Sequence, residues 1–371
     1  GNKEVDDDYM AQEKTLCIQP ELLRKEGGAL KIVYTPLHGS GNIPVRRILQ
    51  EVGITNVSVV KEQEQPDPNF STIKVPNPED PAAFALAIKL ADEVGADVIF
   101  GTDPDCDRLG VAVRDREGKF QLLTGNQIGC VLLHYILSTR KKLGTLPENG
   151  AAVKSIVSTS LSNRICSAFG VKMFETLTGF KFIGEKIQQF QERGDHTFLF
   201  GFEESYGFLS STFVRDKDGV NASLLIAEVA AACRAEGITL YDRLQEIFAA
   251  YGFYVEDVVS TTLPGKDGLT RMKEIMKGLR EHPPVSIGGL KVRAVRDYLS
   301  GLRREGEHVT PTGLPSSDVL YFELEGDNWV CIRPSGTEPK IKLYVNTNHS
   351  NEEEARTMNA RLKEASRQLI V

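Results

Sequence analysis

Residues 97–108 read DVIFGTDPDCDR, a short apolar run that passes directly into a loop with three aspartates. Apolar residues at helical spacing over 82–94 precede the run, so the pattern predicts a helix, then a strand, then a loop at the carboxyl end of that strand. In open α/β sheets, ligands bind at the carboxyl ends of the strands. The stretch therefore predicts an α/β domain with a binding loop.

The three aspartates of this loop, Asp103, Asp105 and Asp107, favour a metal site. Their mutual repulsion in a partly buried loop requires a counter-charge, and carboxylate oxygens are the ligands that Mg²⁺ prefers. An EF-hand is excluded, because Arg108 stands where that loop needs glycine and Arg114 where it needs glutamate. A haloacid-dehalogenase phosphatase, with Asp103 as nucleophile and Asp105 as acid, stays open, and so does a solvated acidic turn.

The alternation of strand and helix recurs on both sides of this loop. Upstream, a β-branched run at 30–34 is interrupted at 35–41 and followed by helical spacing over 44–52. Downstream, a second series of strands and helices extends from about residue 119 to 235. We therefore expect two α/β domains with mixed, largely parallel sheets.

The sequence pattern changes beyond residue 251. Short strands separated by turns are predicted there, together with a helix at 272–279 and a final helix that has Ser350 and Glu353 in capping-box register. The predicted strands are 255–262, 319–324, 329–332 and 340–345. This part is expected to be an α+β domain with a mainly antiparallel sheet.

Two further loops carry polar groups. Residues 201–207 read GFEESYG, whose adjacent carboxylates and hydroxyl suit the vicinal hydroxyls of a polyol, although a polar turn explains the loop equally well. Residues 333–340 read RPSGTEPK and combine an arginine fork, two hydroxyls and a flexible glycine, a pattern typical of a phosphate cradle. A plain hairpin turn is the alternative.

Charge, apolar content and cysteine spacing exclude several classes of partner and site. The 371 residues carry 44 Lys and Arg against 51 Asp and Glu, a net charge of -7, which argues against nucleic acid or an anionic membrane as a partner. No apolar run approaches the ~20 residues of a membrane span. The six cysteines have no CxxC spacing and indicate reduced thiols rather than disulfides or a zinc site. We expect a cytoplasmic protein.

In this order and at this spacing, the loops resemble those of the α-D-phosphohexomutase family (phosphoglucomutase/phosphomannomutase), with wording similar to phosphoglucomutase-like members. Residues 178–181 resemble the loop that orients the sugar, and 214–219 the segment after the sugar loop. The resemblance implies domain II over 1–118, domain III over 119–250 and domain IV over 251–371. It implies metal binding by Asp103, Asp105 and Asp107, catalysis by Arg108 and Lys217, and substrate binding by Thr178, Gly179, Lys181, Glu203, Ser205, Arg333, Ser335, Gly336 and Thr337.

The resemblance also implies a reaction. Members of this family are intramolecular phosphotransferases that interconvert hexose 1-phosphate and hexose 6-phosphate through a bisphosphorylated intermediate. Mg²⁺ is then the cofactor, hexose 1,6-bisphosphate the activator and small-molecule sugar phosphates the partners of a monomer or weak dimer. A phosphopentomutase, a sugar-bisphosphate synthase of the same family and a non-catalytic sugar-phosphate-binding pseudoenzyme are alternatives, and the sugar is glucose, mannose or a pentose.

One departure from the family pattern affects activity. The family's phosphorylated serine lies in a Thr/Ser-Ala-Ser-His-Asn-Pro motif that does not occur in this sequence. Ser40 is not assigned as nucleophile, because residues 37–41 are instead similar to the opening loop of the family's domain II. We therefore expect the chain to lack an upstream phosphoserine domain and to be inactive alone. Lys181, Lys217 and His38 are candidates for proton transfer.

Overall fold

The structure, a computed structural model, describes residues 2–265 and 267–371 and forms two compact units. Unit 1 contains the described residues of Gly1–Ser158 and Ser162–Ile247, and unit 2 contains Thr159–Leu161 and the described residues of Phe248–Val371. Among the described residues, no helix has the length and apolar character needed to cross a membrane.

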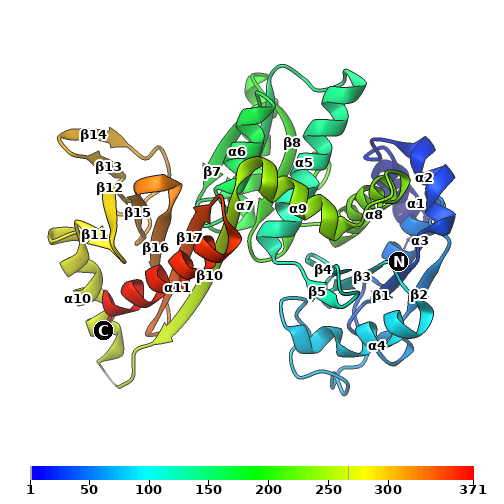
Figure 1. The fold of residues 1–371 in the computed structure, drawn as a ribbon, viewed down its shortest axis with the longest axis horizontal. Coiled ribbons are helices and arrows are strands. Elements are labelled where there is room, and N and C mark those ends of the chain that lie inside the picture. The colour runs from blue at the N-terminus through cyan, green and yellow to red at the C-terminus, as the bar shows by residue number, and fades with distance from the viewer. Residues whose placement is uncertain (1, 266) are drawn as a thin grey trace. The chain divides into compact units, whose positions relative to one another are not determined.

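The first sheet of unit 1 has five strands in the order β2-β1-β3-β4-β5. β1, β2 and β3 run parallel, whereas β4 and β5 are added antiparallel. The strands are β1 (Ile32–Thr35), β2 (Val57–Val59), β3 (Val98–Thr102), β4 (Leu109–Arg114) and β5 (Phe120–Leu122). Helix α4 (Ala85–Val94) packs Ala87 and Ala91 against Val33 and Ile99 of this sheet. Figure 1 shows α4 on one face of the sheet and α8 (Gly219–Ala235) on the other.

The second sheet of unit 1 has four strands in the order β7-β6-β8-β9. β7 (Lys172–Thr176), β6 (Gly150–Ser155) and β8 (Thr197–Glu203) are parallel, and β9 (Gly207–Leu209) is antiparallel to β8. The surrounding helices include α5 (Gly125–Leu143), α6 (Leu161–Ala168), α7 (Phe180–Arg193) and α9 (Leu240–Tyr251). α8 is buried from Gly219 to Cys233 and contacts β3, β4 and β9, so it packs against both sheets.

The N-terminal part of unit 1 also contains helices that the sequence analysis did not predict. These are α1 (Lys3–Lys14) and α2 (Pro20–Glu26), which precede β1, while α3 (Asn42–Glu51) follows it at the predicted place. α1 is polar along most of its length and buries only Met10 and Glu13, so it lacks the apolar periodicity from which a helix is recognised.

Unit 2 is built on a sheet in which every pairing is antiparallel. Met272 and Met276 of α10 and Leu362 of α11 share one core with Phe322 and Leu343 of the sheet. Figure 1 shows α11 alongside β10 and β17. The elements are β10 (Phe253–Thr262), α10 (Gly268–Glu281), β11 (Ser286–Ile287), β12 (Leu290–Asp297), β13 (Leu302–Glu305), β14 (His308–Pro311), β15 (Leu320–Leu324), β16 (Trp329–Pro334), β17 (Lys340–His349) and α11 (Glu352–Gln368).

The predicted fold class is confirmed: two mixed, largely parallel α/β sheets and a C-terminal antiparallel sheet. The predicted capping box at Ser350 is wrong, because Asn351 is the N-cap of α11 and its side chain accepts a hydrogen bond from the Glu354 backbone at 3.1 Å. The division into three domains after residues 118 and 250 stays a prediction.

Candidate functional site

The three aspartates lie in the loop that joins β3 to β4. Asp103 is 8% exposed, and its Oδ1 accepts hydrogen bonds from the backbone N–H groups of Asp107 (3.1 Å) and Arg108 (2.9 Å). Cys106 has a φ of +59°, which turns the chain so that these bonds close. One carboxylate oxygen from each aspartate lies within 4.8 Å of the other two. The loop therefore gathers three hard oxygen ligands at one point, a donor set that fits Mg²⁺.

The charges of this loop repel one another. Burial, together with the negative charges of Asp107 and Asp105, raises the pKa of Asp103 to about 7, although the N–H of Arg108 acts in the opposite direction. A divalent cation would remove the repulsion and favour the ionised form. The electrostatics thus agree with the geometry of the donor set.

Two basic side chains lie against the aspartates. The Lys217 Nζ is 3.0 Å from Asp107 Oδ2 and 3.3 Å from Asp216 Oδ1. Burial acts to lower the pKa of Lys217, but these two carboxylates prevail and raise it. The Nε of Arg108 lies 3.9 Å from one oxygen of Asp103 and 3.9 Å from one of Asp107. The loop therefore has positive charge beside it that can meet an anionic ligand.

The predicted sugar loop joins β8 to β9. Glu203 is 5% exposed, and its Oε1 accepts a hydrogen bond from the Gly179 N–H at 2.6 Å. Burial and the charge of Glu204 raise the pKa of Glu203 to about 7. The Oε2 of Glu204 instead accepts bonds from the hydroxyls of Ser155 (2.9 Å) and Ser158 (3.2 Å). The two adjacent carboxylates thus have different partners, and Glu203 is the one tied to the 178–181 loop.

Backbone contacts join the metal loop to the sugar loop. Leu109 N–H donates to the Tyr206 carbonyl at 3.1 Å, and Arg108 and Gly207 form an antiparallel bridge. A Cβ on Gly207 would lie 2.4 Å from the Cδ of Lys217, so the approach of Lys217 requires glycine at this position. Unit 1 therefore brings together the three aspartates, Arg108, Lys217, the 203–207 loop and residues 178–181.

The sequence analysis identified the 37–41 loop but did not place it at this site. Ser40 N–H donates to the Pro104 carbonyl at 2.8 Å, and a Cβ on Gly39 would lie 2.4 Å from the Pro104 Cα. The sequence signals were a glycine-rich break after a strand and the similarity of residues 37–41 to a loop that opens domain II of the family, and neither places the loop beside the aspartates. His38 is 7% exposed, and its ring nitrogens contact the Gln65 carbonyl (2.9 Å) and the Thr72 hydroxyl (2.8 Å). His38 therefore holds the 65–72 segment against the 37–41 loop through these two hydrogen bonds.

Unit 2 carries the predicted phosphate loop, between β16 and β17. Arg333 Nη1 donates to the Tyr344 hydroxyl at 3.0 Å, and the Ser335 N–H donates to the Lys340 carbonyl at 2.7 Å. Gly336 and Thr337 are exposed, and a Cβ on Gly336 would meet no described atom within 4 Å. The loop is an open turn with an arginine, two hydroxyls and accessible backbone at its surface.

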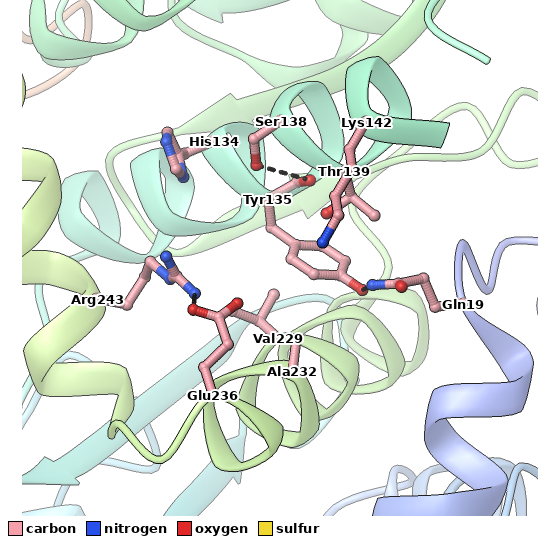
Figure 2. A pocket seen from close by; sticks show the side chains of 10 residues that line it. All are labelled: Gln19, His134, Tyr135, Ser138, Thr139, Lys142, Val229, Ala232, Glu236 and Arg243. Carbon is pink, nitrogen blue, oxygen red and sulfur yellow. Dashed lines mark hydrogen bonds and ion pairs between the residues drawn. The ribbon is translucent and has the colours of Figure 1, made fainter. Parts of the chain in front are cut away.

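A pocket of about 140 Å³ also lies in unit 1, lined mainly by α5 and α8 (Figure 2). Gln19 Nε2 donates to the Tyr135 hydroxyl at 3.0 Å on one side, and Arg243 pairs with Glu236 on the other. None of the predicted site residues lines this pocket. It is distinct from the site formed by the loops.

Family models and curated relatives of the same kind match this chain along most of its length. Residues 7–118, 124–251 and 306–364 match, in turn, the α/β/α domain II, the α/β/α domain III and the C-terminal domain of phosphoglucomutase/phosphomannomutase. The phosphoglucomutase of Staphylococcus aureus (strain MSSA476) is 39% identical over 345 residues, which cover 92% of this chain and 60% of that protein. The chain thus spans about 60% of the length of the curated relatives it matches.

Solved structures share the fold. The open form of pp63/parafusin, a phosphoglucomutase from Paramecium, superposes with a TM-score of 0.71 at 18% identity, covering 98% of this chain and 62% of that one. N-acetylphosphoglucosamine mutase from Aspergillus fumigatus, solved with GlcNAc-6P and magnesium, gives a TM-score of 0.52 at 13% identity, covering 97% and 66%.

Proposed function

The chain belongs to the α-D-phosphohexomutase family, as domains II to IV, and we propose that the whole protein interconverts hexose 1-phosphate and hexose 6-phosphate through a bisphosphorylated intermediate. The observation that carries the proposal is the cluster of three carboxylates and two cations, hydrogen-bonded through its backbone to the loop of Glu203. Transfer of a phosphoryl group depends on positioning and charge neutralisation, and this cluster is suited to both.

Each predicted residue has a role in the proposal. Asp103, Asp105 and Asp107 would hold Mg²⁺, which supplies charge neutralisation for the transferring phosphoryl group. Lys217 and Arg108 bind and orient phosphoryl oxygens. The remaining residues bind substrate: the sugar hydroxyls at Thr178, Gly179, Lys181, Glu203 and Ser205, and the phosphate that is not transferred at Arg333, Ser335, Gly336 and Thr337.

The proposal extends to the conditions of the reaction. Hexose 1,6-bisphosphate is the proposed activator, and the acceptor and donor serine is proposed to lie in a part of the protein outside this chain. All six cysteines, which lie within the described residues, are free thiols, in line with the proposed cytoplasmic location. We expect a monomer or weak dimer.

A mutase assay of the natural full-length protein tests the proposal. With Mg²⁺, glucose 1,6-bisphosphate and glucose 1-phosphate, the protein should form glucose 6-phosphate, and Asp105→Asn should reduce kcat at least a hundredfold. Glu281→Gln is the matched control, because Glu281 is exposed on α10 and, within residues 2–265 and 267–371, pairs with Lys277 alone, at 3.7 Å.

The same assay separates the alternatives. Faster turnover of ribose 1-phosphate would identify a phosphopentomutase, and accumulation of bisphosphate a synthase. Binding of glucose 1-phosphate by calorimetry without any turnover would identify a pseudoenzyme. Release of inorganic phosphate by this chain alone, abolished by Asp103→Asn, would replace the mutase with a phosphatase.

A further inference from the structure

A buried carboxyl group without a hydrogen-bond donor lies in α1. Glu13 is 0% exposed, and among the described residues neither of its carboxylate oxygens has a hydrogen-bond partner. An ionised carboxylate is strongly disfavoured in such surroundings, and a buried polar group without a partner requires an explanation. The surroundings of Glu13 therefore disfavour its ionised form.

The strongest charge near Glu13 is that of an acidic side chain. Burial and the charge of Asp218 act to raise the pKa of Glu13, whereas Asn221 and Tyr9 lie near enough to act in the opposite direction, although neither makes a hydrogen bond of normal geometry to it. Asp218 is 7% exposed and already accepts three hydrogen bonds: from the N–H groups of Val220 (2.9 Å) and Asn221 (3.0 Å), and from the Tyr9 hydroxyl (2.7 Å). Two neighbouring carboxyl groups in buried surroundings do not both ionise unless a cation lies between them.

The nearby cations have other partners. Lys14 pairs with Glu51 at 2.7 Å, and Arg47 of α3 pairs with Asp7 at 2.6 Å. The other titratable groups of this region are Cys17, Glu228 of α8 and Cys106 of the metal loop, none of which supplies positive charge. A proton is the cation that this closely packed site can accommodate.

We propose that Glu13 is uncharged in the folded protein and donates a hydrogen bond to the Asp218 carboxylate, and that this pair, together with Tyr9, positions Lys217 and the backbone that supports the metal loop. The second half rests on the function proposed above. A carboxylate offers about four acceptor positions, so Asp218 can accept a fourth bond. In agreement with this geometry, burial and the charge of Asp218 raise the pKa of Glu13 to about 9.

Asp218 connects Glu13 to the metal loop. It is the N-cap of α8 and directly follows Lys217, whose Nζ contacts Asp107 at 3.0 Å. Its own N–H donates to the Phe208 carbonyl at 3.1 Å, and the N–H of Gly219 donates to the Cys106 carbonyl at 3.0 Å. A shift of Asp218 therefore moves Lys217 and the backbone that supports the metal loop. Tyr9 and Glu13 act through Asp218 and are positioning residues.

The segment that carries Glu13 is fixed to α8 at a second place. Ile18 N–H donates to Glu228 Oε1 at 2.8 Å, and the Tyr135 hydroxyl donates to Glu228 Oε2. Gln19 donates in turn to Tyr135, a pair that Figure 2 shows at the edge of the pocket. Glu13 lies between these contacts and those of Tyr9, so its burial is set by packing on both sides.

The proton on Glu13 is tested by stability as a function of pH. The unfolded chain releases this proton near pH 4.5 and the folded chain near pH 9, so the wild-type protein loses stability as pH rises between these values. Glu13→Gln keeps an N–H donor for Asp218 and cannot ionise. Its melting temperature, measured on this chain, should rise relative to the wild type from pH 5 to pH 9. If the difference in melting temperature between Glu13→Gln and the wild type does not change with pH, Glu13 is not protonated in the folded protein.

Infrared spectroscopy of the wild-type chain tests the proton on Glu13 even if Glu13→Gln folds poorly. At pH 8, where Asp103 and Glu203, with pKa values of about 7, are mostly ionised, the C=O stretching band of a neutral carboxyl should be present in the wild-type chain, and it should be lost well above pH 9. A wild-type spectrum without that band at pH 8 would refute an uncharged Glu13.

The positioning half is tested by Mg²⁺ calorimetry on this chain at pH 7 and pH 9.5. Wild type and Glu13→Gln should bind Mg²⁺ equally at pH 7. At pH 9.5 the wild type should bind at least threefold more weakly than Glu13→Gln, because a shift of Asp218 disturbs the hydrogen bond from Gly219 N–H to the Cys106 carbonyl and with it the metal loop. Tyr9→Phe, which loses one bond to Asp218, should be weaker at both pH values. If the Mg²⁺ affinity of the wild type and of Glu13→Gln changes equally with pH, the positioning role of Glu13 is wrong, while the proposed metal site is unaffected. If no variant binds Mg²⁺, both the positioning role and the proposed metal site are wrong.

Discussion

Replacement of Gly39 by alanine tests whether the 37–41 loop supports the metal loop. The added Cβ would lie 2.4 Å from the Cα of Pro104 and 2.6 Å from its carbonyl oxygen, and both are backbone atoms next to Asp103. A normal contact requires a separation about 1 Å larger, so the two loops must move apart. The hydrogen bond from Ser40 N–H to the Pro104 carbonyl, 2.8 Å long, would then break.

The size of the effect follows from these two changes. Overpacking of this kind costs typically about 1–3 kcal/mol, and loss of one hydrogen bond adds about 1 kcal/mol. We therefore expect Gly39→Ala to lower the free energy of unfolding of unit 1 by about 2–4 kcal/mol. Because a displacement near 1 Å is large for a site of three converging carboxylates, Mg²⁺ affinity should fall roughly tenfold or more.

Urea unfolding followed by far-UV circular dichroism measures the stability, and calorimetry measures Mg²⁺ binding. Gly278→Ala is the matched control, since its Cβ would meet no described atom within 4 Å inside helix α10. That change should stabilise unit 2 by about 0.5–1 kcal/mol, as monitored by the single tryptophan, Trp329. A Gly39→Ala chain with wild-type Mg²⁺ affinity and a loss below about 0.5 kcal/mol would refute the reasoning.

Three further predictions concern charge. Burial and Glu204 raise the pKa of Glu203 from 4.5 to about 7, so ionisation of Glu203 should lower wild-type stability by up to about 3 kcal/mol between pH 4.5 and 7. Urea midpoints at pH 5 and pH 8 should therefore fall less for Glu203→Gln than for the wild type, although Asp103 and Glu13, whose pKa values are also raised, still titrate in the variant. Burial of Glu323 opposes its ionisation, but Arg303 and Arg296 prevail and lower its pKa to about 2. Its stabilisation, up to about 3 kcal/mol, is therefore present above pH 4.5 and lost as pH falls toward 2, and Glu323→Gln, followed by Trp329 fluorescence, should differ from wild type at pH 7 much more than at pH 2.5. Lys217→Met removes a cation 3.0 Å from Asp107, so the chain should bind Mg²⁺ roughly threefold more tightly by calorimetry, while the full-length protein should lose turnover; weaker Mg²⁺ binding would contradict the proposed role.

The sequence predicted the parts of the fold that depend on local pattern. The strand at 98–102 and the aspartates after it are where periodicity and loop chemistry placed them. The strand at 109–114, by contrast, joins the sheet antiparallel, a matter of pairing that its own residues do not encode. Similarly, Asn351 replaces Ser350 as a cap, because either residue type can cap and only the backbone geometry selects one.

The support of the site was harder to predict than its chemistry. Glu13 lies in a helix of largely polar sequence, which reads as solvent-exposed, yet it is fully buried against α8. The contact of Gly39 with Pro104 joins positions 65 residues apart and exists only after β1 and β3 pair. Such features depend on tertiary packing, and no periodicity in the sequence reports them.

The proposed function depends on a metal centre formed by Asp103, Asp105 and Asp107. Anomalous diffraction from crystals of this chain soaked in Mn²⁺ tests it most directly, because the ion takes the oxygen ligands that suit Mg²⁺ and its position is read from the map. We expect a peak within about 2.5 Å of one oxygen from each of the three aspartates. A saturated crystal with no peak at this loop, or with its strongest peak elsewhere in unit 1, would contradict the account.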